Sequence, residues 1–168
     1  MTTYRDFNTP DAFTTTAIGQ PGERTFLLQF RGEGEVITLK CEKQQVAAIA
    51  HFMRELLKDL PNSNETPLPE ALRLAPYQNF DFVVGPISVA YDRELDRVIV
   101  NLDEMVPLDE DGEPEDDIVA SCVRGLITRA QALAFCDHAD EVVAAGRPSC
   151  RWCGMPVNPD GHPCPRMN

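Results

Sequence analysis

The chain has 168 residues, and its 27 acidic and 15 basic side chains give a formal net charge of −12. Apolar residues make up 43% of the chain and charged residues 25%, which indicates one ordinary globular domain, or one domain with a short appendage, and excludes a disordered chain. The acidity argues against nucleic-acid binding through bulk charge, because the phosphate backbone repels an acidic surface.

The sequence contains no stretch typical of a membrane span or of a secretory signal. No window approaches 18 consecutive apolar residues, and the first residues, MTTYRDF, contain no apolar core. We therefore expect no membrane contact and a cytoplasmic location, where disulfides are rare.

The first half of the chain predicts strands followed by a helix. Residues 1–22 are polar and contain two prolines, so we expect an irregular arm with one short strand at 13–18. Two β-type runs at 24–30 and 35–41 flank a glycine-containing turn, which favours a hairpin. Apolar residues then recur every three or four positions over 46–60, which predicts an amphipathic helix that Pro61 ends.

The second half repeats this order after a long connection. Residues 61–79 contain four prolines and predict a loop or linker. Three short β-type runs lie between 80 and 102, and a further extended segment is expected at 118–127. The run 109–117 between them holds seven acids and no base, and we expect a solvated loop there. A second helix is predicted at 128–146, with a Thr–x–x–Gln capping box at its start and a capping glycine at its end.

This order predicts an α+β fold. We expect an antiparallel sheet of two strand clusters with two amphipathic helices on one face, formed by residues 1–147, and a separate C-terminal tail at 148–168.

The two halves raise the question of an internal repeat. Each runs strands first and then a helix with a glutamine in its first turn, Gln44 and Gln131, and aligning these also pairs His51 with His138. The apolar stripes do not superpose in that register, so both a duplication and an unrelated pair of halves stay open.

The six cysteines fall into two groups. Three lie singly among apolar residues and are predicted to be small core side chains: Cys41, Cys122 and Cys136. The other three crowd with His162 into the last nineteen residues, in the pattern Cys150–x–x–Cys153–Gly and then His162–x–Cys164.

The C-terminal cluster predicts one structural Zn²⁺ per chain, held by Cys150, Cys153, His162 and Cys164. Zinc prefers four such ligands in a tetrahedron, and a full set leaves no open position for a hydrolytic water. The tail is rich in proline and poor in apolar side chains, so burial alone does not offset its ordering entropy. Alternatives are a redox Cys–x–x–Cys, a disulfide, another metal or a disordered tail. One residue separates His162 from Cys164, whereas two residues are more usual in zinc ribbons. His162 is therefore the ligand whose spacing departs from the common pattern.

Several segments resemble a family of proteins, mainly actinobacterial, known as domain of unknown function family 3090. They cover nearly the whole chain: GQPGERTFLLQ at 19–29, EKQQVA at 42–47, LITRAQA at 126–132, AAGRPSCRWCG at 144–154 and DGHPCPR at 160–166. The resemblance implies the same four metal ligands and no established activity. It also implies a recurring genomic trio with a histidine-phosphatase-like and a lipid-kinase-like protein.

Other side chains are weaker candidates for binding. Arg24 follows a Pro–Gly turn and is expected to pair with an acid, and His51 and His138 lie near the edges of helical stripes, where partly buried structural histidines are common. Trp152 is expected to pack the knuckle onto the domain, or else to stack on a partner. The acidic run lacks the ligand spacing of a calcium loop.

Three functions are compatible with these features. The first is a cytoplasmic, non-catalytic binding or adaptor protein that has a structural zinc and a protein partner. The second is an enzyme, or an enzyme subunit, of small-molecule or phosphate metabolism that uses Arg24, His51 or His138. The third is a zinc knuckle that contacts RNA, which the net charge makes the least favoured.

Overall fold

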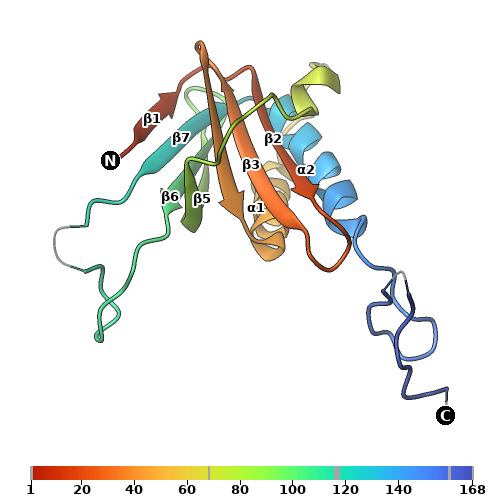
Figure 1. Ribbon diagram of the computed structural model, residues 1–168. Coiled ribbons are helices and arrows are strands. Elements are labelled where there is room, and N and C mark those ends of the chain that lie inside the picture. The colour runs from red at the N-terminus through yellow and green to blue at the C-terminus, as the bar shows by residue number, and fades with distance from the viewer. Residues whose placement is uncertain (1, 68, 116–117, 159, 168) are drawn as a thin grey trace.

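The computed structural model describes residues 2–67, 69–115, 118–158 and 160–167. These residues form one mixed seven-stranded sheet, in the order β1-β7-β6-β5-β4-β3-β2, together with two α-helices and one short 3₁₀ helix (Figure 1). The strands are β1 (Tyr4–Phe7), β2 (Ala12–Ile18), β3 (Thr25–Gly32), β4 (Glu35–Cys41), β5 (Phe82–Asp92), β6 (Arg97–Glu104) and β7 (Cys122–Ile127). The helices are α1 (Lys43–Leu57), η1 (Pro69–Leu72) and α2 (Arg129–Ala144).

The predicted α+β class and the two antiparallel strand clusters are confirmed. The strands β2, β3 and β4 form one antiparallel meander, and β5, β6 and β7 form the other. The sheet as a whole is mixed, because β4 and β5 join the meanders as a parallel pair through Leu39–Phe82 and Lys40–Val83. The strand β1 also pairs in parallel, with β7 at the edge of the sheet.

Local sequence explains most element boundaries. In the β3–β4 hairpin, Glu33 and Gly34 both have positive φ, as the commonest two-residue hairpin turns require. The predicted runs on either side of Gly85 form one strand, β5, with a register shift between Val84 and Ile87. The extended segment expected at 118–127 is a strand only from Cys122 onward.

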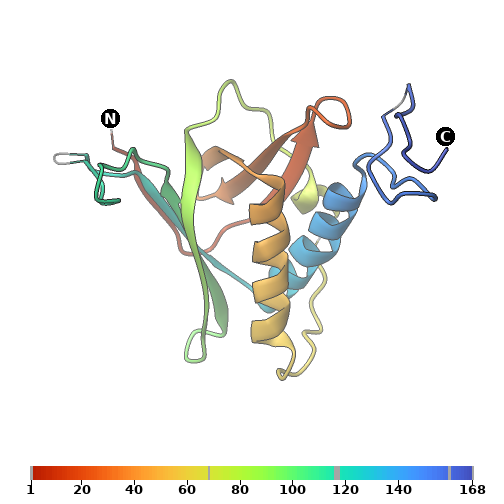
Figure 2. The ribbon, with the colours of Figure 1, turned by 90° about the horizontal axis from the view of Figure 1, so that it is seen from below.

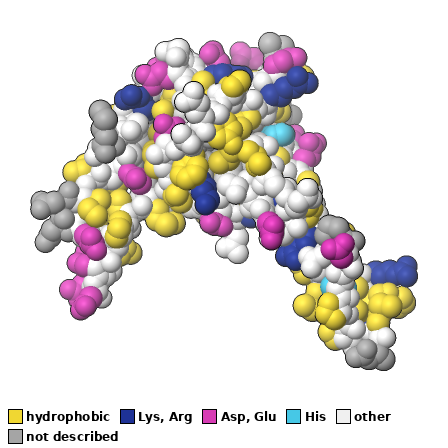
Figure 3. All heavy atoms as spheres, in the orientation of Figure 1, with side chains coloured by type: hydrophobic (Ala, Val, Ile, Leu, Met, Phe, Trp, Pro, Cys, Tyr) yellow, Lys and Arg dark blue, Asp and Glu magenta, His cyan; other side chains and the backbone are white. Residues whose placement is uncertain are grey.

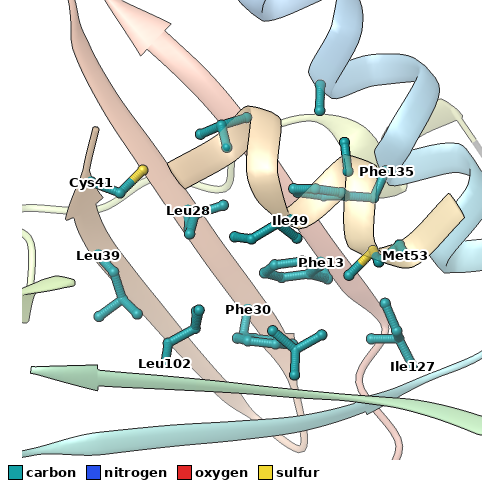
Figure 4. Close-up of a cluster of buried hydrophobic side chains, with 14 of the residues drawn as sticks. Phe13, Leu28, Phe30, Leu39, Cys41, Ile49, Met53, Leu102, Ile127 and Phe135 are labelled. Carbon is teal, nitrogen blue, oxygen red and sulfur yellow. The ribbon is translucent and has the colours of Figure 1, made fainter. Parts of the chain in front are cut away.

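Both helices lie on one face of the curved sheet, as expected (Figure 2). The buried stripe of α1 is formed by Val46, Ile49, Ala50, Met53 and Leu57, and that of α2 by Ala130, Ala132, Phe135, Cys136 and Ala139. They cover a core in which four rings stack in series from strand to helix: Phe7 on Phe30, Phe30 on Phe13 and Phe13 on Phe135, with centroids 5.4, 4.4 and 4.5 Å apart. Figure 4 shows Phe30, Phe13 and Phe135 of this series.

The predicted loop at 61–79 covers buried polar groups of the first meander. The Gln29 side chain lies in the sheet, with its amide donating to Thr38 Oγ1 and Ala75 O and its carbonyl accepting from Ala75 N. Thr14 Oγ1 similarly donates to Leu72 O. The loop therefore satisfies polar side chains that would otherwise be costly to bury.

The two halves share one topology, and the buried positions of their helices align in a register that differs by one residue from the pairing of Gln44 with Gln131. Each half is a three-stranded meander followed by a helix, and equivalent strands run in the same direction. The third helical residue, Gln45 in α1 and Gln131 in α2, completes a capping box in both. Superposing these two glutamines also superposes buried residues: Val46 on Ala132, Ile49 on Phe135, Ala50 on Cys136 and Met53 on Ala139.

The acidic run behaves as the expected exposed loop as far as it is described. Residues 109–115 are exposed, and Asp109 Oδ1 accepts from the backbone N–H groups of Asp111 and Glu113. Asp116 and Asp117 lie outside the described residues. Among the helices that the structure describes, none has both the length and the apolar character needed to cross a membrane.

Candidate metal centre

The first half of the C-terminal segment is a tight turn that carries two cysteines. Ser149 and Pro156 face each other as an isolated antiparallel bridge, and Cys150 N donates to Met155 O at 2.7 Å. Gly154 N donates to Cys150 O at 2.8 Å, and Gly154 has φ +74°, a conformation that favours glycine. This turn brings the side chains of Cys150 and Cys153 to the same side.

A second turn returns the chain to these cysteines. Asn158 and Gly161 form another isolated bridge, and Gly161 N donates to Asn158 O at 2.8 Å. His162 and Cys164 follow directly. We refer to residues 148–167 as the C-terminal module.

The module brings together all four ligands predicted from the sequence. One ligand atom from each of Cys150, Cys153, His162 and Cys164 lies within 4.8 Å of the other three. Cys150 Sγ is 3.9 Å from Cys164 Sγ, and Cys153 Sγ is 3.2 Å from His162 Nε2. The edge of a ZnS₄ tetrahedron is about 3.8 Å for Zn–S bonds of about 2.3 Å. The cluster could therefore hold a metal ion, and it fits a zinc knuckle.

The electrostatic setting of the cluster favours ionised sulfur at one ligand. Backbone N–H groups of Cys153 and Trp152 point at Cys150 Sγ, the latter at 3.4 Å, and they hold the pKa of the Cys150 thiol below its ordinary value. A thiolate is the form that binds a metal.

The three scattered cysteines have the opposite character. Cys41 and Cys136 belong to the hydrophobic core, and burial raises their pKa to about 12 and about 11. Cys122, which is also expected in the core, is instead half-buried in β7, and desolvation with the neighbouring Asp103 raises its pKa to about 12. These thiols stay protonated at neutral pH.

Trp152 is more exposed than the packing interpretation predicts. It is 52% exposed, and the guanidinium of Arg151 lies over its ring at 5.0 Å from the centroid. Figures 1 and 3 show the module extending away from the sheet and helices, with apolar side chains on its visible surface. Its exposure fits the alternative interpretation, in which the ring contacts a partner.

The structure does not bring the weaker candidates together. His51 is exposed on α1, where it lies edge-on to Phe52. His138 Nε2 is 2.9 Å from Thr15 O, which makes it a structural side chain between α2 and β2. Arg24 lines a different place, a cleft next to the C-terminal module, and it has no acid partner among the ion pairs of the described residues.

Sequence reasoning missed two residues of that cleft, Lys43 and Arg147. They come from the start of α1 and from the residues after α2, so no spacing pattern links them with Arg24. The one local feature that could have indicated the cleft is Gly146. The sequence predicts that this glycine caps α2. The cap is instead Ala145, and Gly146 does not adopt the left-handed conformation of a capping glycine.

The fold and the cluster together define an α+β protein with a C-terminal Cys/His module suited to a metal ion. The chain belongs to the family described as Protein of unknown function (DUF3090), whose family model matches residues 5–164 and so includes all four candidate ligands. No curated protein and no solved structure matches the chain.

Proposed function

We propose that the chain is a cytoplasmic, non-catalytic binding or adaptor protein, in which one structural Zn²⁺ orders the C-terminal module and the module contacts a protein partner. The observation that carries this proposal is the convergence of three cysteine sulfurs and one histidine nitrogen within 4.8 Å of one another. This set matches the Cys₃His class of structural zinc sites.

The composition of the ligand set supports a structural role over a catalytic one. Four protein ligands fill the tetrahedral shell of zinc, whereas hydrolytic zinc sites have three protein ligands and a water. The three cysteines of the cluster form no disulfide, so their thiols are available as metal ligands.

Exposed apolar side chains on the module support partner binding. Trp152 and Met155 are each 52% exposed, and Met167 is 71% exposed. Tryptophan is enriched among residues that contribute most to protein interfaces, and methionine adapts to irregular surfaces. A small metal-ordered module that displays these groups is suited to a protein surface with apolar pockets.

The alternative functions have less support. The enzyme hypothesis expects Arg24, His51 or His138 to lie in a cleft, and of these only Arg24 lines the cleft next to the C-terminal module. The RNA hypothesis stays a prediction with the net charge of −12 against it.

Metal analysis of the intact chain tests the zinc part of the proposal. We expect about one zinc per chain by inductively coupled plasma mass spectrometry, and a loss of zinc in Cys153→Ser. The matched control Cys122→Ser changes a half-buried cysteine outside the module and should retain the metal. Metal-free protein whose module is nonetheless ordered by NMR would overturn the assignment.

A second experiment tests the module as the binding surface. Affinity capture from the native cells is expected to recover a protein that the Trp152→Ala variant no longer retains, although that variant still contains zinc. Phe52→Ala is the matched control, because Phe52 is a similarly exposed aromatic ring on α1. Equal loss with both variants, or capture unaffected by Trp152→Ala, would contradict the proposal.

A further inference from the structure

Three basic side chains from distant parts of the chain converge on one cleft. Arg24 precedes β3, Lys43 is the first residue of α1, and Arg147 leads from α2 into the C-terminal module. The cleft between them has a volume of about 220 Å³, and Pro156 of the module contributes to its wall. Figure 3 shows basic side chains where the module meets the rest of the protein.

Two glycines make this convergence possible. A methyl group at Gly146 would lie 3.1 Å from Arg24 Nη2 and 3.5 Å from Lys43 Nζ, so the two charged groups lie within about 7 Å of each other. A methyl group at Gly22 would lie 3.2 Å from Arg147 Nε. The absence of side chains at these positions therefore leaves room for the three cations.

Both arginines are held in place through one part of their guanidinium group. Arg24 Nη1 donates to Val142 O at 3.0 Å, and its Cζ lies 4.9 Å from the centre of the Phe26 ring. Arg147 Nη1 donates to Asn158 Oδ1 at 2.8 Å. No other hydrogen bond of these two guanidinium groups occurs among the described residues, which leaves N–H groups for a ligand at little further cost in side-chain entropy.

No ion pair among the described residues neutralises this clustered positive charge. Among the residues that the structure describes, no carboxylate oxygen lies within 4.0 Å of the charged nitrogens of Arg24, Lys43 or Arg147. This contrasts with a chain that has twelve more negative than positive side chains. Three like charges held together repel one another, and a bound anion would relieve that repulsion.

We propose that this cleft binds the phosphate group of a small soluble ligand. A phosphate monoester carries close to two negative charges and three acceptor oxygens, which matches three cationic donors better than the single charge of a carboxylate. The cleft is smaller than the roughly 300–1,000 Å³ pockets that enclose drug-sized ligands, so it fits an anionic group and not a whole large molecule. The net negative charge of the protein disfavours an anionic membrane as the source of that phosphate.

NMR titration of the full, metal-loaded chain with inorganic phosphate tests the proposal. At low ionic strength we expect saturable shifts of the Gly22 and Gly146 amides, and much weaker shifts with acetate at equal ionic strength. Lys43→Met should weaken phosphate binding about tenfold or more, in line with the loss of a charge-assisted contact. Arg24→Gln should do the same, but it also removes the hydrogen bond to Val142 O, so Lys43→Met is the cleaner variant.

Arg93→Gln is the matched control, because Arg93 is an exposed cation in the β5–β6 turn, away from the cleft. Equal weakening by Arg93→Gln would show a general charge effect and overturn the site. Equal affinity for acetate would overturn the phosphate class, and shifts confined to Cys150–Gly154 would place phosphate on the metal. Flotation with phosphatidic acid vesicles separates the sources of phosphate. If the protein floats with the vesicles and Lys43→Met abolishes this, the proposal of a soluble ligand is overturned. If the protein does not float with the vesicles, the result supports a soluble ligand.

Discussion

Removal of the proposed zinc is expected to disorder the C-terminal module and leave the rest of the protein folded. Trp152 is the single tryptophan of the chain and lies between two ligands, so its fluorescence anisotropy reports on the module alone. Both α-helices end before the module begins, so far-ultraviolet circular dichroism reports on the body of the protein. On addition of a strong chelator we expect the anisotropy to fall and the helical signal to stay.

The ligand set determines the expected change in zinc affinity, and the position of the core determines the expected effect on the melting temperature. Structural zinc sites contribute roughly 10–16 kcal/mol of apparent binding free energy, equivalent to dissociation constants from tens of nanomolar to about picomolar. Cys153→Ser removes one ligand and should weaken zinc binding by at least about 100-fold, because loss of a group that only orients a ligand already costs about 10–100-fold. The largest fully buried side chains all lie between Phe7 and Phe135, so the melting temperature of the helical signal should not change.

Competition with a chelator of known affinity provides the measurement, with Cys122→Ser as the control that keeps zinc affinity unchanged. Loss of the metal with an unchanged, high Trp152 anisotropy would contradict this prediction, since the module would then be ordered without zinc. Loss of the helical signal together with the anisotropy would also contradict it, since zinc would then contribute to the stability of the body.

Three further predictions concern the body of the protein. Gly125→Ala should destabilise it by about 1–3 kcal/mol in urea unfolding, because the new methyl would overlap the Phe30 ring, and combination with Phe30→Leu should recover part of that loss; additive losses would contradict this. Cys41, with its pKa raised by burial to about 12, should resist alkylation at neutral pH until the protein unfolds, so rapid labelling of native protein would be inconsistent. The backbone N–H of Ser121 donates to the Glu104 carboxylate and holds the pKa of Glu104 below its ordinary value. The stabilisation from this hydrogen bond is therefore present at neutral pH and is lost as the pH falls through the pKa that Glu104 has in the folded protein. Glu104→Gln should therefore destabilise at pH 7 and less in acid, and a pH-independent difference would count against it.

The sequence predicted the parts of the fold that depend on neighbouring residues. The β3–β4 hairpin, both helices and the capping box of α2 follow from local periodicity and turn chemistry. The strand β1 was missed because only Phe7 of its four residues is buried and because its partner, β7, lies more than a hundred residues away. The parallel joining of β4 and β5 likewise has no local signature.

The same distinction applies to the sites. The four metal ligands lie close together in the sequence, so spacing and donor chemistry were sufficient to predict their convergence. The cleft of Arg24, Lys43 and Arg147 depends on how three remote segments meet, and each residue alone has the pattern of an ordinary surface cation. Gly22 and Gly146 can be recognised as part of this cleft only when the basic side chains next to them are known.

The helix of each meander–helix half packs on the meander of the other half, although each half is continuous in the sequence. The two helices pack against each other, and among the strands α1 packs mainly against β5 and α2 mainly against β2, so each helix covers the first strand of the opposite half. The amide of Gln45 donates to Val84 O, and that of Gln131 donates to Pro10 O, which fastens each helix start to the half it does not belong to. A polypeptide cut in the connecting loop would therefore yield fragments that each expose an uncovered strand and fold only on meeting.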